Sequence, residues 1–126
     1  MNGKRIEIRV KRVYEDPEET DGRRILVDRL WARGLSREKA KVDVWVKEIA
    51  PSTELRRWYA HDPNKWAEFK SRYFAELEAN FGQVEEILGE IQAGIVTFLY
   101  SSKEEQLNNA VALKEYMESM IHDKDV

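Results

Sequence analysis

Four cationic side chains in this sequence lie near the points where apolar, strand-like segments end: Arg12, Arg29, Arg33 and Lys103. In an open α/β sheet, the carboxyl ends of parallel strands meet along one edge, and ligands bind beyond that edge. Guanidinium and ammonium groups gathered there, with backbone N–H groups at helix starts, would hold an anion such as phosphate, a nucleotide or a carboxylate. We therefore expect a small anionic ligand to bind at these residues.

Two further residues of this region could serve acid–base chemistry, and we take both as candidate catalytic residues. His61 is one of two histidines in the chain and could transfer a proton near neutral pH. Asp28 directly precedes Arg29 and could orient an arginine or accept a hydrogen bond from a ligand hydroxyl. Structural alternatives stay open, because Asp28 and Arg29 could form an ion pair that only fixes the loop, and His61 could be a hydrogen-bonded residue at a helix junction.

Trp31 and Ser52 complete the ligand-binding candidates that the residue pattern supports. Trp31 lies between two arginines just beyond a strand end, which suits stacking on a base or another ring. Ser52 stands at the start of a helical segment, where a serine is more often a helix cap than a nucleophile.

Four segments have the residue pattern of strands, and their ends must position these side chains. Ile6 to Val10 alternates aliphatic and charged residues, which indicates a strand with one face in water. The continuous apolar runs 25–27 and 95–100 are typical of strands covered on both faces. A third strand is predicted where valines alternate with other residues over 42–46.

Helical segments alternate with these strands. Ser36 is expected to cap one short helix, and Ser52 or Thr53 another. The dipeptide Asp62-Pro63 is a strong helix-start signal, since it combines a capping residue with proline at the first helical position.

The later helices and the chain length complete the predicted architecture. Gly82 is expected to end the helix that begins near residue 63, and Gly94 to close an amphipathic helix over 84–91. The last helix carries its apolar stripe over 110–121. This alternation favours a single α/β domain spanning 1–126, with a small, mostly parallel central sheet of about four strands flanked by helices. The first loop is short for a helical crossover, so the first strand could run antiparallel at the edge.

Composition excludes several classes of site. The chain has no cysteine, which excludes disulfides, thiolate catalysis and cysteine-ligated zinc or iron–sulfur centres. Its two histidines, His61 and His122, are far apart in the sequence, so no metal site is expected. No glycine-rich nucleotide motif occurs, and we expect no cofactor.

Charge and hydropathy limit the partners. The net charge of −3 supplies no global basic field, so nucleic acid is not the favoured partner. The apolar runs are too short to cross a membrane and the N-terminus lacks a signal-peptide core, so we expect a cytoplasmic protein. The aromatic-rich segment from Trp58 to Phe81 could line a homodimer interface as well as a core.

Several long blocks of the sequence together resemble the DUF488 family, in its YeaO-like branch. The blocks are KRVY (11–14), DGRRILVDRLWARGLSREKA (21–40), WVKEIAPSTELRRWYAHDPNKW (45–66) and VTFLY (96–100). The resemblance implies a compact α/β domain and leaves the activity open, since the family name itself denotes a domain of unknown function. The polar motif positions correspond here to Arg12, Asp28, Arg29, Arg33, Ser52, His61, Asp62 and Lys103.

The chain departs from the family pattern at two positions. Ala32 stands where the family usually has proline, and Leu107 stands where it usually has histidine. The neighbouring Asn108 is retained, and we take it as a further ligand-binding candidate. If that histidine serves chemistry in relatives, this protein lacks it, which favours a binding site over a shared catalytic mechanism. An enzyme built on this site would be expected to hydrolyse or transfer a phosphate or glycosidic group. The alternative is a non-catalytic module that contacts protein or nucleic acid through the same basic, aromatic edge.

Overall fold

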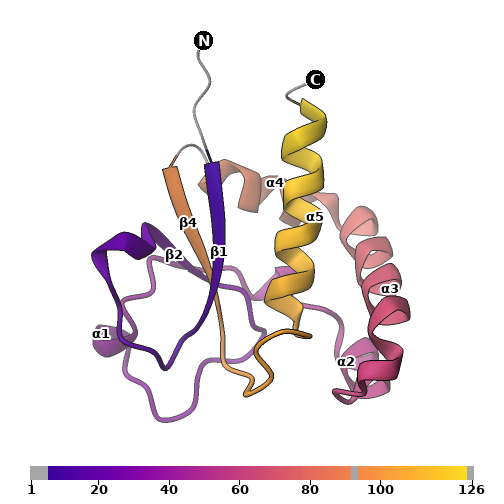
Figure 1. Cartoon of the computed structure of the whole chain (residues 1–126), viewed down its shortest axis with the longest axis horizontal. Helices are drawn as coiled ribbons and strands as arrows, with labels where there is room; N and C mark the ends of the chain where they lie inside the picture. The colour runs from indigo at the N-terminus through magenta and orange to yellow at the C-terminus, as the bar shows by residue number, and fades with distance from the viewer. Residues whose placement is uncertain (1–5, 92–93, 125–126) are drawn as a thin grey trace.

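The computed structural model describes residues 6–91 and 94–124, which form a four-stranded sheet with helices on both faces (Figure 1). The strands are β1 (Ile6–Arg12), β2 (Arg23–Leu26), β3 (Val44–Trp45) and β4 (Gly94–Tyr100), in the spatial order β1-β4-β2-β3. All three pairings are parallel, so the predicted α/β class is confirmed. The first strand is parallel to β4 despite its short connection to β2, because β4 is inserted between them.

The described residues form five α-helices, which cover the two faces of this sheet unequally. They are α1 (Arg37–Ala40), α2 (Thr53–Tyr59), α3 (Trp66–Ala79), α4 (Phe81–Glu90) and α5 (Asn109–Lys124). Figure 1 shows α2 to α5 on one side of the sheet and α1 on the other. None of the helices in the described part of the chain is long and apolar enough to cross a membrane.

The apolar residues of β2 and β4 contribute to two separate hydrophobic clusters, because neighbouring residues of a strand point to opposite faces. Phe98 packs into the large cluster beneath α2 to α5, whereas Leu99 packs into a smaller one. Ile25 and Leu26 divide in the same way. The smaller cluster is closed by Ala40 of α1 and by the loops around it. Both central strands are therefore covered on two faces, as their continuous apolar character predicts.

The third strand is shorter than the alternation over 42–46 predicts. Only Val44 and Trp45 pair with β2, and a 3₁₀ helix, Lys47–Ile49, follows at once. Pairing is limited by the partner, since β2 itself ends at Leu26. The carboxylate of Asp43 accepts a hydrogen bond from the Arg24 N–H at 2.8 Å and helps to set this short register.

Two glycines do not end helices as expected. The helix predicted to run to Gly82 ends at Ala79, and Gly82 lies in the first turn of α4. The break is at Asn80, whose non-helical backbone redirects the chain so that α4 can pack against the same core as α3. Gly94 is the first residue of β4, with φ of 86°, and residues 92–93 lie outside the described residues.

A buried ion pair between Asp21 and Arg24 stabilises the end of the sheet where β2 begins. The two side chains are joined at 2.5 Å, and each residue is only 4% exposed. Lys11 of β1 donates to the same carboxylate at 3.1 Å. Buried charges are tolerated when they are paired and hydrogen-bonded in this way, so this network accounts for charges buried among apolar strands.

Candidate functional site

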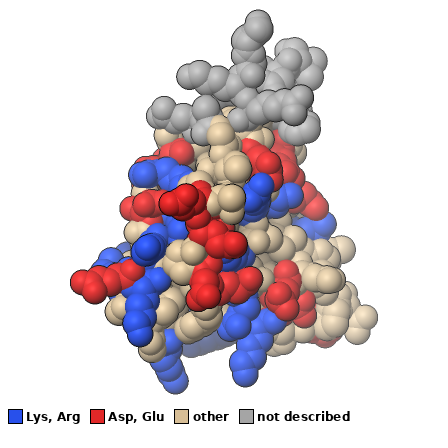
Figure 2. Space-filling model, turned by 60° about the vertical axis from the view of Figure 1, so that its left-hand side comes forward, with Lys and Arg blue, Asp and Glu red and all other residues tan. Residues whose placement is uncertain are grey.

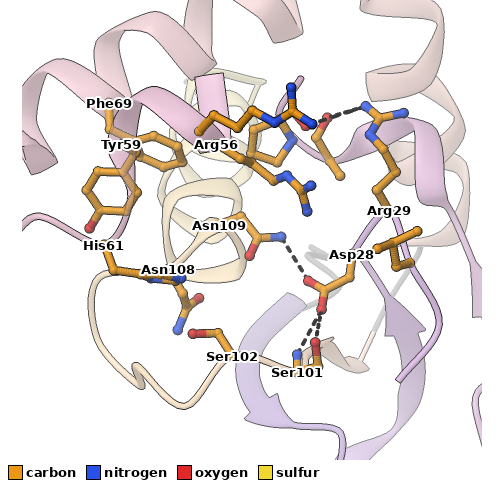
Figure 3. Close-up of a pocket in the computed structure, with 14 residues that line it drawn as sticks. Asp28, Arg29, Arg56, Tyr59, His61, Phe69, Ser101, Ser102, Asn108 and Asn109 are labelled. Carbon is orange, nitrogen blue, oxygen red and sulfur yellow. Dashed lines mark hydrogen bonds between the residues drawn. The ribbon is translucent and has the colours of Figure 1, made fainter. Parts of the chain in front are cut away.

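A pocket of about 400 Å³ lies at the carboxyl edge of the sheet, between the ends of β2 and β4 and the helices α2 and α5 (Figure 3). It is lined by residues from six segments of the chain, with polar groups on most sides. Figure 2 shows lysine and arginine side chains projecting at the lower end of the molecule, with acidic side chains near them. The pocket lies at the carboxyl edge that the strand pattern indicates.

Asp28 holds the floor of this pocket together. Its carboxylate accepts hydrogen bonds from the backbone N–H and the hydroxyl of Ser101, both at 2.8 Å, and from Nδ2 of Asn109 at 3.1 Å. These bonds join the end of β2 to the end of β4 and to the start of α5. Both carboxylate oxygens of Asp28 are thus engaged by protein donors.

Three arginines form the cationic wall of the pocket. Arg29 follows β2 and donates from Nη2 to the Ala50 carbonyl at 3.2 Å, while its buried Nε has no hydrogen-bond partner among the described residues. Arg56 and Arg57 lie in α2 and are exposed. Neither of their guanidinium groups bonds to another residue in the described part of the chain. Because Leu55 and Tyr59 turn into the core, the helix presents these two arginines on its outer side.

Aromatic side chains of α2 and α3 form a second wall. The ring of Tyr59 stacks on Phe69 with centroids 4.3 Å apart, and its hydroxyl donates to the Leu107 carbonyl at 2.8 Å. Burial, followed by the nearby carboxylates of Glu104 and Asp62, raises the pKa of Tyr59. The phenol therefore stays protonated near neutral pH and acts as a donor that holds the loop before α5.

His61 lies at the pocket in an unusual backbone conformation. Its φ is 56°, and the preceding Ala60 has φ of 46°, so two consecutive residues with side chains are left-handed. This region is costly for residues other than glycine and is held by the surrounding packing. The imidazole is exposed, and its ring centroid lies 6.1 Å from that of Tyr59.

The start of α5 closes the remaining side. Asn108 is only 2% exposed; its Nδ2 donates to the Glu104 carbonyl at 2.8 Å and its Oδ1 accepts from the Val111 N–H at 3.0 Å. It thus caps the helix while lining the pocket. Ser102 also lines the pocket, and its hydroxyl oxygen accepts from the Glu104 N–H at 3.0 Å.

Four of the residues predicted for the site meet at the pocket: Asp28, Arg29, His61 and Asn108. Arg12 does not line it. Its guanidinium donates to the carbonyls of Ser101 and Ser102 at 3.1 and 2.9 Å, so it supports the pocket loop from behind. The separation follows from the strand order, because β1 is an edge strand and β4 lies between it and β2.

Ser52 lies beside a neighbouring, smaller cavity of about 170 Å³, which shares Arg29 with the main pocket. The serine caps α2, with its Oγ accepting from the Leu55 N–H at 3.0 Å, and it donates to the Glu76 carboxylate at 2.6 Å. Its hydroxyl is therefore occupied in joining α2 to α3.

Trp31, Arg33 and Lys103 also lie outside the pocket lining. The Trp31 indole packs edge-on against Trp45 at 5.5 Å and donates to the Leu35 carbonyl at 2.7 Å, as part of the smaller core cluster. Arg33 and Lys103 are exposed.

Some lining residues are absent from the sequence-based set: Arg56, Arg57, Ser101, Ser102 and Asn109. The pattern of α2 places Leu55 and Tyr59 inward, so it identifies the two arginines as outward-facing. Whether this outer side faces the pocket depends on how α2 packs against the rest of the domain. The local sequence does not indicate that packing. Among the described residues, no group of three or more histidines and carboxylates is placed to hold a metal ion.

Fold and pocket together define a small α/β domain with a parallel sheet and a polar, arginine-lined pocket at its carboxyl edge. The chain belongs to the DUF488 family: residues 7–126 match the group described as "Inactive DUF488-N3 subclade". This match and a YeaO relative together confirm the resemblance to the family and its YeaO-like branch.

Curated relatives agree with this assignment. The uncharacterized protein YeaO of Escherichia coli is 38% identical over 115 residues, which cover 91% of this chain and all of that protein. Uncharacterized proteins of Mycobacterium tuberculosis and Mycobacterium bovis are 51% identical over 70 residues, 56% of this chain. That match spans 59% of the length of the mycobacterial proteins. No solved structure matches the chain.

Proposed function

We propose that the pocket binds a small phosphate-bearing anion and that the protein acts by binding rather than by catalysis. The observation that carries this proposal is the placement of Arg29, Arg56 and Arg57 around one pocket of about 400 Å³. Such a volume lies in the range of roughly 300–1,000 Å³ that is usual for ligand sites. Guanidinium groups match phosphate oxygens with paired hydrogen bonds, and those of Arg56 and Arg57 have no partner among the described residues.

The proposal of binding without chemistry rests on three supports. Asp28, a candidate acid or base, has both carboxylate oxygens engaged by Ser101 and Asn109. The resemblance to the family implies a histidine where this chain has Leu107, which leaves His61 as the one histidine among the described residues that line the pocket. The family description also calls this subclade inactive.

A second function, contact with a protein or nucleic acid through the same edge, is favoured by one observation. Leu30 lines the pocket and is 67% exposed, so the edge of the pocket presents apolar surface beside its arginines. A macromolecular partner could cover it. A steep dependence of oligonucleotide affinity on salt concentration would support the nucleic-acid form of this alternative.

The proposed function is tested by titrating the full chain with inorganic phosphate, followed by amide NMR shifts. We expect shifts around the pocket, and we expect Arg56→Ala combined with Arg57→Ala to weaken phosphate binding by about 10- to 100-fold. Arg33→Ala is the matched control, because Arg33 is also exposed but does not line the pocket. Equal affinity in all three proteins, or no binding by the wild type, would refute the proposal.

A further inference from the structure

We infer that the ligand is the phosphate ester of a sugar, with the sugar hydroxyls bound on the side of the pocket opposite the arginines. This inference rests on the proposed function. Figure 3 shows Arg29 and Arg56 along one side of the pocket, and Ser101, Ser102 and Asn108 along the other. The pocket therefore has a cationic wall from β2 and α2, and a neutral, hydroxyl and amide wall from the β4–α5 connection.

Unused hydrogen-bonding capacity on the neutral wall indicates what it would bind. Asn109 donates from Nδ2 to the Val27 carbonyl and to Asp28, but its Oδ1 accepts from no described residue. The hydroxyl of Ser102 accepts from the Glu104 N–H, and its proton has no acceptor in the described chain. Ser101 donates its proton to Asp28 and keeps a lone pair. The neutral wall thus offers both a donor and acceptors.

That combination complements hydroxyl groups rather than phosphate oxygens. A sugar hydroxyl donates one hydrogen bond and accepts others, so the hydroxyls of a sugar can donate to Asn109 Oδ1 and accept from Ser102. The ionised oxygens of a phosphate monoester only accept hydrogen bonds, and they would be repelled by the carboxylate of Asp28 and by Asn109 Oδ1. The phosphate is therefore assigned to the arginine wall, and the hydroxyls to the neutral one.

The volume of the pocket favours a phosphate ester over free phosphate as the ligand. A water molecule takes up about 30 Å³ in the liquid, and phosphate has only a handful of heavy atoms. A pocket of about 400 Å³ is much larger than the ion needs, and phosphate alone would leave the neutral wall in contact with water.

The tyrosine, phenylalanine and tryptophan rings near the pocket do not offer an open face for a nucleobase, and the exposed imidazole of His61 is the smaller aromatic ring that lines it. The ring of Tyr59 is packed against Phe69 at 4.3 Å and is buried. Trp31 packs against Trp45 away from the pocket lining. The pocket thus offers a nucleobase no large open ring, so we expect its ligand to be recognised mainly through the sugar and the phosphate.

Three probes test this inference by calorimetry on the full chain: inorganic phosphate, ribose 5-phosphate and AMP. We expect ribose 5-phosphate to bind about tenfold more tightly than phosphate, and AMP to bind within about threefold of ribose 5-phosphate. Ser102→Ala should weaken ribose 5-phosphate by about three- to tenfold and leave phosphate affinity unchanged. Ser36→Ala, which removes a helix cap far from the pocket lining, is the matched control and should change neither affinity.

The outcomes distinguish this inference from the proposed function. Equal binding of phosphate and ribose 5-phosphate would overturn the sugar assignment and leave the anion site standing. AMP binding more than about tenfold tighter than ribose 5-phosphate would overturn it in favour of base recognition. No binding of any probe would overturn both. The comparison of the three probes on the wild type decides the question even where a variant does not fold.

Discussion

The carboxylate of Asp28 accepts two hydrogen bonds from Ser101, one from its backbone N–H and one from its hydroxyl, each at 2.8 Å. Asp28 follows β2 and Ser101 follows β4, so the two bonds fasten the ends of neighbouring parallel strands. Asn109 adds a third bond and brings the start of α5 to the same carboxylate. One charged side chain thereby fixes three sides of the pocket.

Asp28→Ala is expected to destabilise the protein by about 2–3 kcal/mol, because three hydrogen bonds to one charged acceptor are lost. The free energy of unfolding from urea titration measures the effect. Asp16→Ala serves as the control, since Asp16 is exposed and forms no hydrogen bond or ion pair with another described residue. A variant with the wild-type unfolding free energy would show that the Asp28 carboxylate does not stabilise the fold.

Glycine at either of the two left-handed positions beside the pocket should stabilise the fold. A comparison of the two variants distinguishes the effect of backbone strain on stability from a contact of His61 with the ligand. Ala60→Gly and His61→Gly each remove an unfavourable Cβ at positive φ, and each should raise the unfolding free energy by about 0.5–1 kcal/mol. Only His61→Gly should also lower phosphate affinity, because the imidazole lines the pocket. Equal phosphate affinity in the two variants would argue against a ligand contact by His61.

The free energy of unfolding should fall at acidic pH, because Asp21 becomes protonated there. Its burial disfavours the charged form, but hydrogen bonds from the Glu18 N–H, Lys11 and Arg24 outweigh burial and lower the pKa of Asp21. A lowered pKa contributes stability above the unfolded-state value of about 4, and this contribution is lost as the pH falls through the folded-state pKa. Urea unfolding from about pH 7 to about pH 3 should show this loss. Asp21→Asn should flatten it, and equal slopes for the two proteins would exclude this role.

Gly22→Ala should be strongly destabilising, by about 3 kcal/mol or more. A Cβ at Gly22 would lie 2.0 Å from the Ile95 carbonyl oxygen, and φ is 65° there. Gly82→Ala is the matched control, because Gly82 lies in α4 with open space around it and should gain up to about 1 kcal/mol. Thermal unfolding gives the melting temperatures of both variants. Similar melting temperatures would contradict the close packing of Gly22 on β4.

Features of the fold that depend on local chemistry could be predicted from the sequence. The apolar runs of β2 and β4 predict strands covered on both faces, and Ser36 and Ser52 cap their helices as expected. Asp62 also caps, although it opens a 3₁₀ turn, Pro63–Lys65, that leads into α3. Side-chain periodicity and capping act within a few residues, so a single sequence contains the information that they need.

By itself, the sequence determined that this chain forms an α/β domain of the DUF488 family, with polar side chains at the strand ends. Only the tertiary structure decided which of them share a pocket. It brought Arg56 and Arg57 beside Arg29, and it placed Arg12 behind the pocket loop and Trp31 in the smaller core. The physical reason is that pocket membership depends on strand order and on the docking of α2. Both are set by contacts between residues far apart in the chain, which no local pattern encodes.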